Sequence, residues 1–336
     1  MRKIVQIKTI DSITPIENAD AIEAAHLGGW TIVIKKGEFQ PGEAVLYFEI
    51  DSFLPGTVPE FEFLLARGTK TVTDPQGDEV QGHVLKTARL RGTFSQGLVL
   101  PLAWGLTETS PQDEVDETME ALGVFKWEPP VPTGGQQVGA FPGHVMKTDS
   151  ERVQNLTDEF LASLDKSEWI ATEKIDGTSA TFTKTPDGEF IVASRNWALD
   201  PEGTHAHAEI ARRLNLAEEM PNGSTIQGEI FGEGIQKNPL KAQGTQFRVF
   251  SAEGIDPDSP LGAKVEKARV PALDFTLPDT VAEAVEQVYK MKSTVNPQVQ
   301  AEGVVWWNKN GTLFEEVGHR PNFKAINNQF LLKHGG

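Results

Sequence analysis

The chain has 336 residues, with 48 acidic against 31 basic side chains and a formal net charge of −17. It contains no cysteine, which excludes disulfides, thiolate metal sites and cysteine nucleophiles. No segment is apolar over a length that would suit a signal peptide or a membrane span, so we expect a cytoplasmic protein without a membrane partner. The acidic balance disfavours nucleic acid as a partner unless a local basic cluster binds it.

Residues 1–105 are predicted to be all-β. Short β-rich runs are separated by turn signals such as Gly28-Gly29 and Pro41-Gly42. The runs are 4–10, 30–35, 44–50, 83–86 and 98–100. About five short strands in this length predict a small barrel, most commonly the oligonucleotide-binding (OB) barrel. Residues 13–20, 42–45 and 53–55 resemble the tRNA-binding OB modules of some synthetases, which implies an OB-like fold and a link to RNA.

The densest basic cluster of this half is Lys86, Arg89 and Arg91. On a strand, Arg89 and Arg91 would share one face. A stripe that contacts RNA phosphates and a solvated strand edge are both compatible with this pattern.

A connection follows the predicted barrel. Residues 105–123 are acidic, with a helix expected over 113–122, and residues 127–143 are rich in proline and glycine. We expect the domain boundary there, with an OB-like nucleic-acid-binding domain over 1–128 and a second domain over 129–336.

The second half is predicted to be an α+β domain of mainly antiparallel sheets with flanking helices. A first helix, capped by Asp149 or Ser150, is expected from the spacing of Val153, Leu156, Phe160 and Leu164. Further helices are expected at 206–216 and 281–291, and strands at 169–172, 178–184, 189–194, 225–231, 246–250, 301–307 and 322–327.

A single lysine lies in a predicted turn between two of these strands, in Glu173-Lys174-Ile175-Asp176-Gly177. A lysine at a strand end can be aimed into a cleft by rigid backbone, and the glycine lets a neighbouring strand or a ligand approach. This geometry suits a nucleophilic amine, although an ordinary hairpin with a solvated lysine fits the same four letters.

Further residues downstream complete an ordered set. Glu229 and Glu302 are carboxylates expected on strands, Phe250 ends an aromatic strand, and Lys324 lies in the last predicted strand. In this order, with Lys174 and Asp176, they resemble the motif series of covalent lysine nucleotidyltransferases, the superfamily of polynucleotide ligases and capping enzymes.

The domain order narrows this resemblance. A leading barrel, followed by Phe141-Pro-Gly-His-Val-Met-Lys-Thr-Asp149 and Glu151-Arg-Val-Gln-Asn155 ahead of the lysine, resembles the ATP-dependent RNA ligases of the Deinococcus and Naegleria type. The resemblance implies sealing of RNA 3′-hydroxyl and 5′-phosphate ends through lysyl-AMP and RNA-adenylate, with ATP and Mg²⁺ or Mn²⁺ as cofactors. RNA or an RNA-containing nicked duplex would be the partner. A DNA ligase and a non-catalytic RNA-binding protein on the same scaffold remain as alternatives.

The resemblance also implies a role for each site residue. Lys174 would be the nucleophile, and Asp176, Glu229 and Glu302 would hold the metal. Nucleotide contacts would come from Glu173, Ile175, Asp176, Gly177, Arg195, Asn196, Glu229, Phe250 and Lys324, with Lys147 and Arg152 at the β- and γ-phosphates. RNA contacts would come from Lys86, Arg89 and Arg91.

Two features need separate treatment. The last motif has Asn322 where relatives commonly carry a second lysine, and Arg320 is a candidate to supply that charge. His205 and His207 have a spacing that could bind metal, but the sequence offers no third ligand beside them.

The lysine at position 174 must be neutral to attack, and we expect burial, Lys324 and a bound cation to favour the neutral amine.

Overall fold

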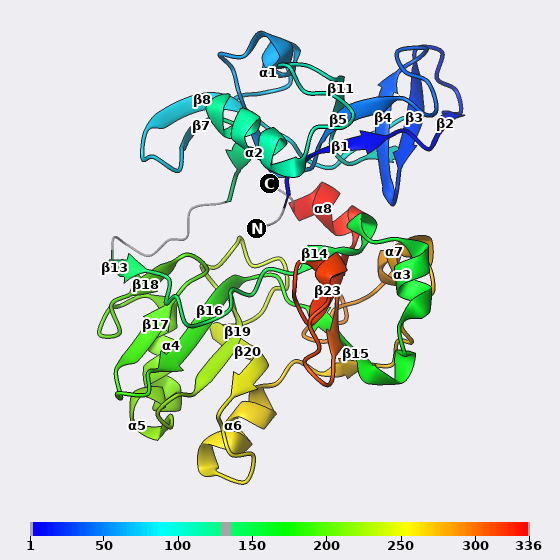
Figure 1. Cartoon of the computed structure of the whole chain (residues 1–336). Helices are drawn as coiled ribbons and strands as arrows, with labels where there is room; N and C mark the ends of the chain where they lie inside the picture. The colour runs from blue at the N-terminus through cyan, green and yellow to red at the C-terminus, as the bar shows by residue number, and fades with distance from the viewer. Residues whose placement is uncertain (1–2, 129–135, 335–336) are drawn as a thin grey trace.

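The computed structural model describes residues 3–128 and 136–334. Figure 1 shows two sheet-rich parts, one above the other, with helix α8 (Asn328–His334) between them. Each part has hydrophobic cores of its own, so each meets the usual criterion for a domain.

The N-terminal part is built almost entirely of short antiparallel strands. They are β1 (Val5–Thr9), β2 (Ser12–Pro15), β3 (Ile22–Leu27), β4 (Trp30–Lys35), β5 (Ala44–Phe48), β6 (Ser52–Pro55), β7 (Lys70–Thr73), β8 (Glu79–Val84), β9 (Ala88–Leu90), β10 (Thr93–Ser95), β11 (Leu98–Pro101) and β12 (Phe125–Lys126). The sheets have the orders β1-β5-β11, β2-β3-β4, β12-β6-β8-β7 and β10-β9. The five predicted strand regions are confirmed, although β8 begins four residues earlier than expected and ends before Lys86.

Three helical segments complete this part: η1 (Pro59–Phe61), α1 (Glu62–Leu65) and α2 (Gln112–Ala121). Alternate residues of β4 are buried, with Trp30, Ile32 and Ile34 in the core, as expected of a strand with one face turned inward. The helix predicted over 113–122 is confirmed as α2.

One expectation for the basic cluster is wrong. Strand β9 ends at Leu90, and Arg91 lies in the turn to β10 with a φ of 48°. Arg89 and Arg91 therefore do not share a strand face. The turn forms because Gly92 also has a positive φ, and the guanidinium Nε of Arg89 donates to the Gly92 carbonyl at 3.1 Å.

The C-terminal part contains two large sheets. The six-stranded sheet has the order β13 (Gln137–Ala140), β18 (Trp197–Leu199), β17 (Phe190–Ala193), β16 (Thr178–Lys184), β19 (Thr225–Gly232), β20 (Thr245–Glu253). The five-stranded sheet has the order β14 (Glu151–Arg152), β23 (Asn322–Ile326), β22 (Gly303–Asn308), β15 (Trp169–Lys174), β21 (Ala272–Leu273). Consecutive strands β15 and β16 belong to different sheets, so the turn 175–177 crosses from one sheet to the other.

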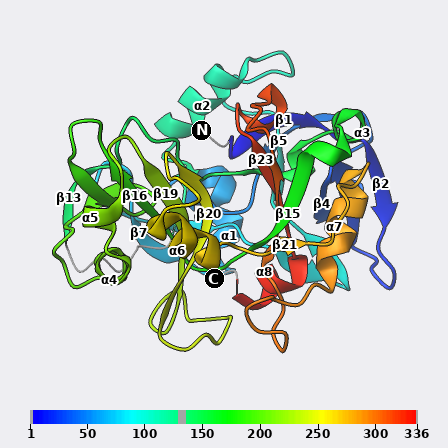
Figure 2. The same ribbon diagram turned by 90° about the horizontal axis from the view of Figure 1, so that it is seen from below.

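Helices cover the outer faces of these sheets. They are α3 (Asp158–Ser163), α4 (Ala206–Leu214), α5 (Leu216–Glu219), α6 (Pro260–Ala268) and α7 (Val281–Tyr289), with short 3₁₀ turns η2 (Val153–Asn155), η3 (Lys166–Glu168) and η4 (Glu315–Val317). Helices α4 and α5 lie at one end of this part and α3 and α7 at the other, in both views (Figures 1 and 2). The predicted α+β architecture is confirmed.

The helix predicted from Asp149 to Leu164 is wrong in its first half. Residues 151–152 form β14, which pairs in parallel with β23, and α3 begins only after Thr157, whose side chain accepts from the Phe160 amide at 3.1 Å. Arg152 is extended because it pairs with Lys324 of β23, and its side chain contacts Glu49 of the N-terminal part. Glu302 was also expected on a strand, but β22 begins one residue later, at Gly303.

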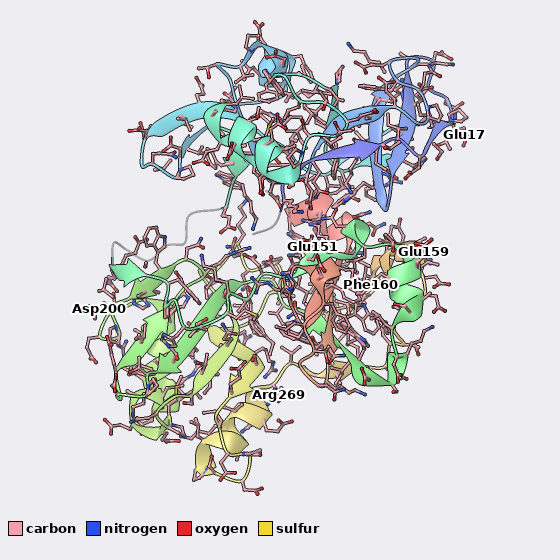
Figure 3. The ribbon with its side chains drawn as sticks, in the orientation of Figure 1. Glu17, Glu151, Glu159, Phe160, Asp200 and Arg269 are labelled. Atoms are coloured by element: carbon pink, nitrogen blue, oxygen red, sulfur yellow. The ribbon has the colours of Figure 1, made fainter. Side chains whose placement is uncertain are left out.

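The two parts meet at residues 151–155. The amide of Gly29 donates to the Gln154 carbonyl at 3.3 Å, and the Trp30 indole donates to Asn155 at 2.7 Å. The Asn155 amide in turn donates to Glu151, which is labelled in Figure 3 at this junction. A side chain at Gly29 would come within 2.8 Å of the Gln154 Cα atom, so this close approach requires glycine.

The boundary expected at 128/129 stays a prediction, because residues 129–135 lie outside the described part. Strand β12 still pairs with β6 of the first part, whereas β13 pairs with β18 of the second. Over residues 3–128 and 136–334, no helix combines the length and the apolar character needed to cross a membrane.

Candidate active site

A cleft of about 420 Å³ lies where the two parts meet. Its walls come from both: Asp51 and Trp127 from the first, and Lys174, Glu229 and Phe330 from the second. Segments more than 270 residues apart in the chain thus line one cavity, which is the usual setting for a ligand site.

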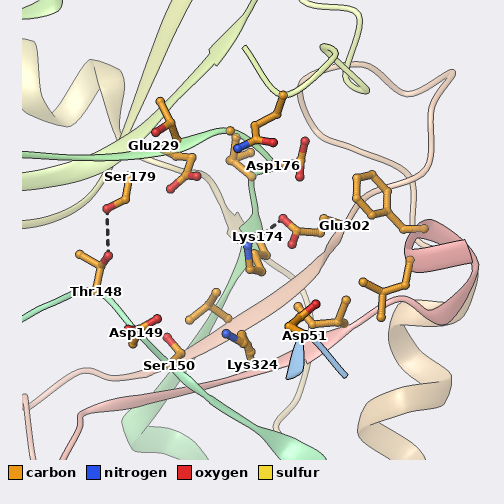
Figure 4. A pocket seen from close by; sticks show the side chains of 18 of the residues that line it. Asp51, Thr148, Asp149, Ser150, Lys174, Asp176, Ser179, Glu229, Glu302 and Lys324 are labelled. Atoms are coloured by element: carbon orange, nitrogen blue, oxygen red, sulfur yellow. Dashed lines mark hydrogen bonds and ion pairs between the residues drawn. The ribbon is translucent and has the colours of Figure 1, made fainter. Parts of the chain in front are cut away.

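Lys174 is the last residue of β15, where it pairs with Gly303 of β22. Its ammonium group donates to a carboxylate oxygen of Glu302 at 2.8 Å (Figure 4). Burial alone would lower the pKa of Lys174, but the nearby carboxylates of Glu302, Glu229 and Asp176 outweigh burial and raise it. Contrary to the sequence-based expectation, these carboxylates favour the protonated amine over the neutral one.

Three carboxylates surround this amine, from the β15–β16 turn, from β19 and from the residue before β22. Burial is the main cause that raises the pKa of Asp176 to about 7 and that of Glu229 to about 8. Repulsion from Glu302 raises both further, while Lys174 opposes the shift. The site therefore concentrates more negative charge than one lysine balances.

The residues present fit a hydrated divalent cation. The donor set is all oxygen, which Mg²⁺ and Mn²⁺ prefer, and three carboxylates lie around a single lysine here. Within the described part of the chain, no three histidine, cysteine or acidic side chains form a cage that could hold a metal ion by itself. Mg²⁺ typically keeps several waters and uses one or two carboxylates together with substrate phosphates, so a cage is not required.

Gly177 allows the turn after Lys174 to pack against β19. A Cβ atom there would lie 2.2 Å from the Ile230 carbonyl oxygen, far inside contact distance. The same turn buries Ile175 in a small core with Phe231, Leu240 and Val270. Position 177 therefore requires glycine if the turn is to pack against β19. The buried side chain of Ile175 holds the turn in place.

An aromatic pair also lines the cleft. The rings of Phe250 and Trp307 stack with centroids 5.7 Å apart and an angle of 22° between their planes, and both line the cleft. The Trp307 indole donates to Thr172 at 3.2 Å, which fixes its orientation. Phe250 was expected at this site from the sequence, whereas Trp307 was not, because only the pairing of β22 with β15 brings it there.

Asp149 is the centre of a second charged group that sequence analysis missed. It accepts from Arg195 and lies 3.8 Å from the Lys126 ammonium. Burial would raise the pKa of Asp149, but the positive charges of Lys126, Arg195, Lys324 and Arg320 hold it well below its ordinary range. Figure 4 shows Asp149 and Lys324 on the other side of Lys174 from Glu229 and Asp176.

The last motif keeps one cation in the cleft. Lys324 lines it from β23, whereas Asn322 is buried on that strand opposite Trp307. Arg320 donates to the Lys147 carbonyl, and its charge acts on Asp149 together with that of Lys324. This location agrees with the hypothesis that Arg320 supplies the missing charge.

Several predicted nucleotide contacts have other partners here. Glu173 is buried and accepts from the Thr294 amide at 2.6 Å, so it ties the loop after α7 to β15. Arg195 lines the cleft, with its Nε atom 3.3 Å from Glu128.

Two further predicted contacts lie at the margin of the site. Lys147 and Asn196 bond to each other at 3.0 Å and lie outside the cleft lining.

Arg152 lines the cleft but pairs with the first domain. Its Nε atom lies 3.3 Å from Glu49, and both side chains are almost fully buried. A longer contact of 3.5 Å reaches Asp51. Its phosphate role stays a prediction. Of the basic cluster 86–91, only Lys86 lines the cleft.

His205 and His207 have roles in folding. The His207 ring is buried and hydrogen-bonds to the Ser179 carbonyl at 3.0 Å, and burial lowers its pKa to about 4. His205 caps α4 by accepting from the Ala208 amide at 3.2 Å. These bonds explain the spacing without a metal.

Comparisons with known proteins agree with this geometry. Residues 4–102 match a family model described as an OB-fold domain, and residues 167–326 match the model of the RNA ligase family. The first of these matches confirms the fold expected for the N-terminal barrel. No match was found among curated proteins.

Solved structures of Naegleria gruberi RNA ligase match nearly the whole chain. An apo mutant is 36% identical, with a TM-score of 0.81, over 99% of this chain and 98% of that one. A mutant with ATP and Mn is 34% identical, with a TM-score of 0.80 and 99% of both chains covered, and another with AMP and Mn is 34% identical, with a TM-score of 0.78 and the same coverage. With the lysine, the three carboxylates and the leading OB-fold domain in the same chain, these matches establish that the protein belongs to the RNA ligase family.

Proposed function

We propose that this chain is an ATP-dependent RNA ligase that joins a 3′-hydroxyl to a 5′-phosphate through lysyl-AMP and RNA-adenylate. The observation that carries the proposal is the Lys174 amine, held 2.8 Å from Glu302 in a cleft with two further carboxylates and a stacked aromatic pair. The relatives of known structure that bind ATP or AMP with Mn support the choice of nucleotide and cation.

Three transfers account for the reaction. Lys174 Nζ attacks the α-phosphate of ATP, a phosphorus–nitrogen bond forms, and pyrophosphate leaves. The AMP then passes to the 5′-phosphate of an RNA end, which frees the lysine. The 3′-hydroxyl displaces AMP, its oxygen forms the phosphodiester, and its proton is lost to solvent. Covalent catalysis of this kind divides one difficult step into easier ones.

The charge around Lys174 decides when it can attack. Because the neighbouring carboxylates raise its pKa, the amine holds its proton while their charge is uncompensated. A bound Mg²⁺ or Mn²⁺ would supply positive charge to these carboxylates and to the α-phosphate. Asp176, Glu229 and Glu302 would hold that cation, and the loss of their field at Lys174 would release the proton from its ammonium group.

The nucleotide would lie between the aromatic pair and the cations. Phe250 would stack on adenine, with Trp307 behind it as a support. Arg195 and Glu229 would contact the ribose, and Lys324 the α-phosphate, with Arg320 adding charge nearby. Lys147 and Arg152 stay predicted contacts of the β- and γ-phosphates, while Glu173, Ile175, Gly177 and Asn196 would shape the site.

The domain division at 128/129 is part of this proposal. The first domain would bind RNA, with Lys86, Arg89 and Arg91 as predicted contacts, and the second would carry the adenylyl transfer. RNA or an RNA-containing nicked duplex is the proposed partner.

Labelling with α-labelled ATP and Mn²⁺ tests the reaction. We expect label on the protein and none on Lys174→Ala. Lys184→Ala is the matched control, because Lys184 also ends a strand but lies outside the cleft. Label that persists on Lys174→Ala would sink the lysyl-AMP intermediate, and an unlabelled wild-type chain would favour a non-catalytic RNA-binding role.

Nicked duplexes with RNA or DNA on the 3′-hydroxyl side then test the substrate. We expect the RNA-ended nick to be sealed faster. Equal sealing of both would favour the DNA ligase alternative.

A further inference from the structure

Three lysines from different parts of the chain gather beside the cleft. Lys70 begins β7, Lys86 follows β8, and Lys237 lies in the long loop between β19 and β20. Lys86 lines the cleft from the N-terminal part, and Lys237 lines it from the C-terminal part. Trp127 also lines the cleft. The Lys70 ammonium lies 3.9 Å from the centre of the Trp127 ring, and this cation–π contact fixes it beside the cleft.

These ammonium groups lie close enough to repel one another. Burial lowers the pKa of Lys70, and the charges of Lys86 and Lys237 lower it further. On the other side, Lys237 and Lys333 add to burial in lowering the pKa of His334 at the end of α8. The cationic group thus extends from β7 across the cleft to α8.

No carboxylate offsets this charge at short range. Over residues 3–128 and 136–334, none of Lys70, Lys86 and Lys237 forms an ion pair, although the chain carries a net charge of −17. Like charges held together cost free energy unless an anion binds them. The three lysines therefore produce a local positive field on an otherwise acidic protein. Such a field suits a polyanion.

The loop that carries Lys237 is held in place. Gln236, Lys237 and Asn238 have φ values of 46°, 60° and 49°, a left-handed run that residues other than glycine rarely adopt. The Asn238 side chain bonds twice to the Ala242 backbone, at 2.8 and 2.9 Å. Leu240, buried in the core, anchors the loop. Lys237 is therefore presented to the cleft by a strained but fixed backbone.

We propose that Lys70, Lys86 and Lys237 bind backbone phosphates of the RNA strand across the junction of the two domains, with Trp127 holding Lys70 in position. This inference rests on the proposed function. It goes beyond the predicted basic stripe, because it adds to Lys86 two lysines from other elements of the chain, Lys70 and Lys237.

The triphosphate of ATP is the less suitable occupant. A separate group of cations, Lys126, Arg195, Arg320 and Lys324, already converges on Asp149 beside Lys174. That group includes the lysine assigned to the α-phosphate. The lysines from β7, β8 and the β19–β20 loop belong to another set, which leaves them for the second substrate.

Lys237→Asn tests the proposal, with Lys241→Asn as a matched control. Both lysines lie in the same loop with positive φ, 60° and 53°, a conformation that asparagine tolerates, but Lys241 lies outside the cleft. The probe is a nicked RNA duplex, titrated onto the full chain by fluorescence anisotropy at several salt concentrations. Each phosphate contact adds about 0.7 to 0.9 to the slope of log K against log salt.

We expect Lys237→Asn to weaken binding at least threefold near 0.1 M salt and to lower the slope by about one unit, whereas Lys241→Asn leaves both unchanged. Lys70→Met, which keeps an apolar stem over Trp127, should give a similar change in slope. Weaker binding with an unchanged slope would indicate a structural role and overturn the proposal, as would equal effects of Lys237→Asn and Lys241→Asn.

The rate of self-adenylylation, measured in parallel, separates RNA from ATP. A loss of adenylylation in Lys237→Asn as large as the loss of RNA affinity would assign the lysine to the triphosphate and overturn the proposal. Failure of wild-type labelling would instead refute the proposed ligase reaction, while the salt slopes would still report whether RNA binds at these lysines.

Discussion

Lys174 illustrates what a residue pattern can and cannot predict. The sequence singled out Lys174, three carboxylates and Phe250, which the structure brings into one cleft, because each belongs to a short ordered motif. The electrostatic outcome was missed, since the pKa of a buried lysine depends on how close the carboxylates come, and three of them outweigh burial. Asp149 and Trp307 were also missed, because their roles come from neighbours more than 40 residues away.

Gly177→Ala is a prediction at this scale. The added methyl group would lie 2.2 Å from the Ile230 carbonyl, and the turn must move away from β19 to admit it. Since Lys174 precedes that turn and Asp176 lies within it, we expect self-adenylylation to fall at least tenfold, with a loss of unfolding free energy of about 1–3 kcal/mol. Gly139→Ala, where nothing lies within 4 Å of the new atom, is the control. A Gly177→Ala protein with wild-type labelling would contradict the close packing.

Among the elements, the helices predicted at 206–216 and 281–291 begin where the sequence placed them, whereas the helix predicted from Asp149 does not. Strands such as β4 and β16 carry clear alternation or β-branched runs, and their bounds were predicted exactly. The helix expected from Asp149 was displaced because β23, far along the chain, supplies a partner for residues 151–152. The spacing of apolar residues within one segment does not predict a strand that will pair with it from far along the chain.

Helix α4 carries a prediction about pH. His207 is buried and its pKa is lowered to about 4, against 6.5 for an ordinary histidine. The unfolded chain therefore takes up the proton first, so this contribution to stability is complete above about pH 6.5 and falls as the pH drops toward 4. From pH 7 to pH 5 the loss from this group should be about 2 kcal/mol.

Urea unfolding at both pH values measures this loss. His207→Gln should show a smaller difference between pH 7 and pH 5, whereas His319→Asn, at an exposed position, should keep the full difference. An unchanged pH dependence in His207→Gln would show that other groups cause it.

At the scale of the whole molecule, the junction between the domains rests on a buried ion pair. Arg152 and Glu49 lie 3.3 Å apart, with side chains 5% and 1% exposed. Breaking one partner of a buried pair typically costs about 3–5 kcal/mol, because the remaining charge stays buried. The order of the domains was predicted from the sequence, but the contact between Arg152 and Glu49 was not. An arginine or a glutamate in a sequence does not indicate which residue of another domain it will pair with.

Arg152→Met and Arg152→Met with Glu49→Gln test this junction. We expect the single variant to lose about 3 kcal/mol of unfolding free energy and the double variant to regain most of it. Arg213→Met, which removes an exposed pair with Glu209, should change stability by less than about 1 kcal/mol.

The same variants test the phosphate role predicted for Arg152. If Arg152 also contacts ATP, the double variant should remain slow in self-adenylylation with a raised KM for ATP. Labelling that recovers together with stability would restrict Arg152 to the junction.

The order of strands also has a consequence for synthesis. Strand β15, which ends at Lys174, pairs with β22 and β21, and both lie about 100 residues or more further along the chain. At a translation rate of roughly 5–20 residues per second, its edges stay unpaired for about ten seconds on the ribosome. An apolar strand with free edges is a template for association with other chains. The strand that carries Lys174 is thus also a part of the nascent chain whose edges are exposed for seconds before its partners are made.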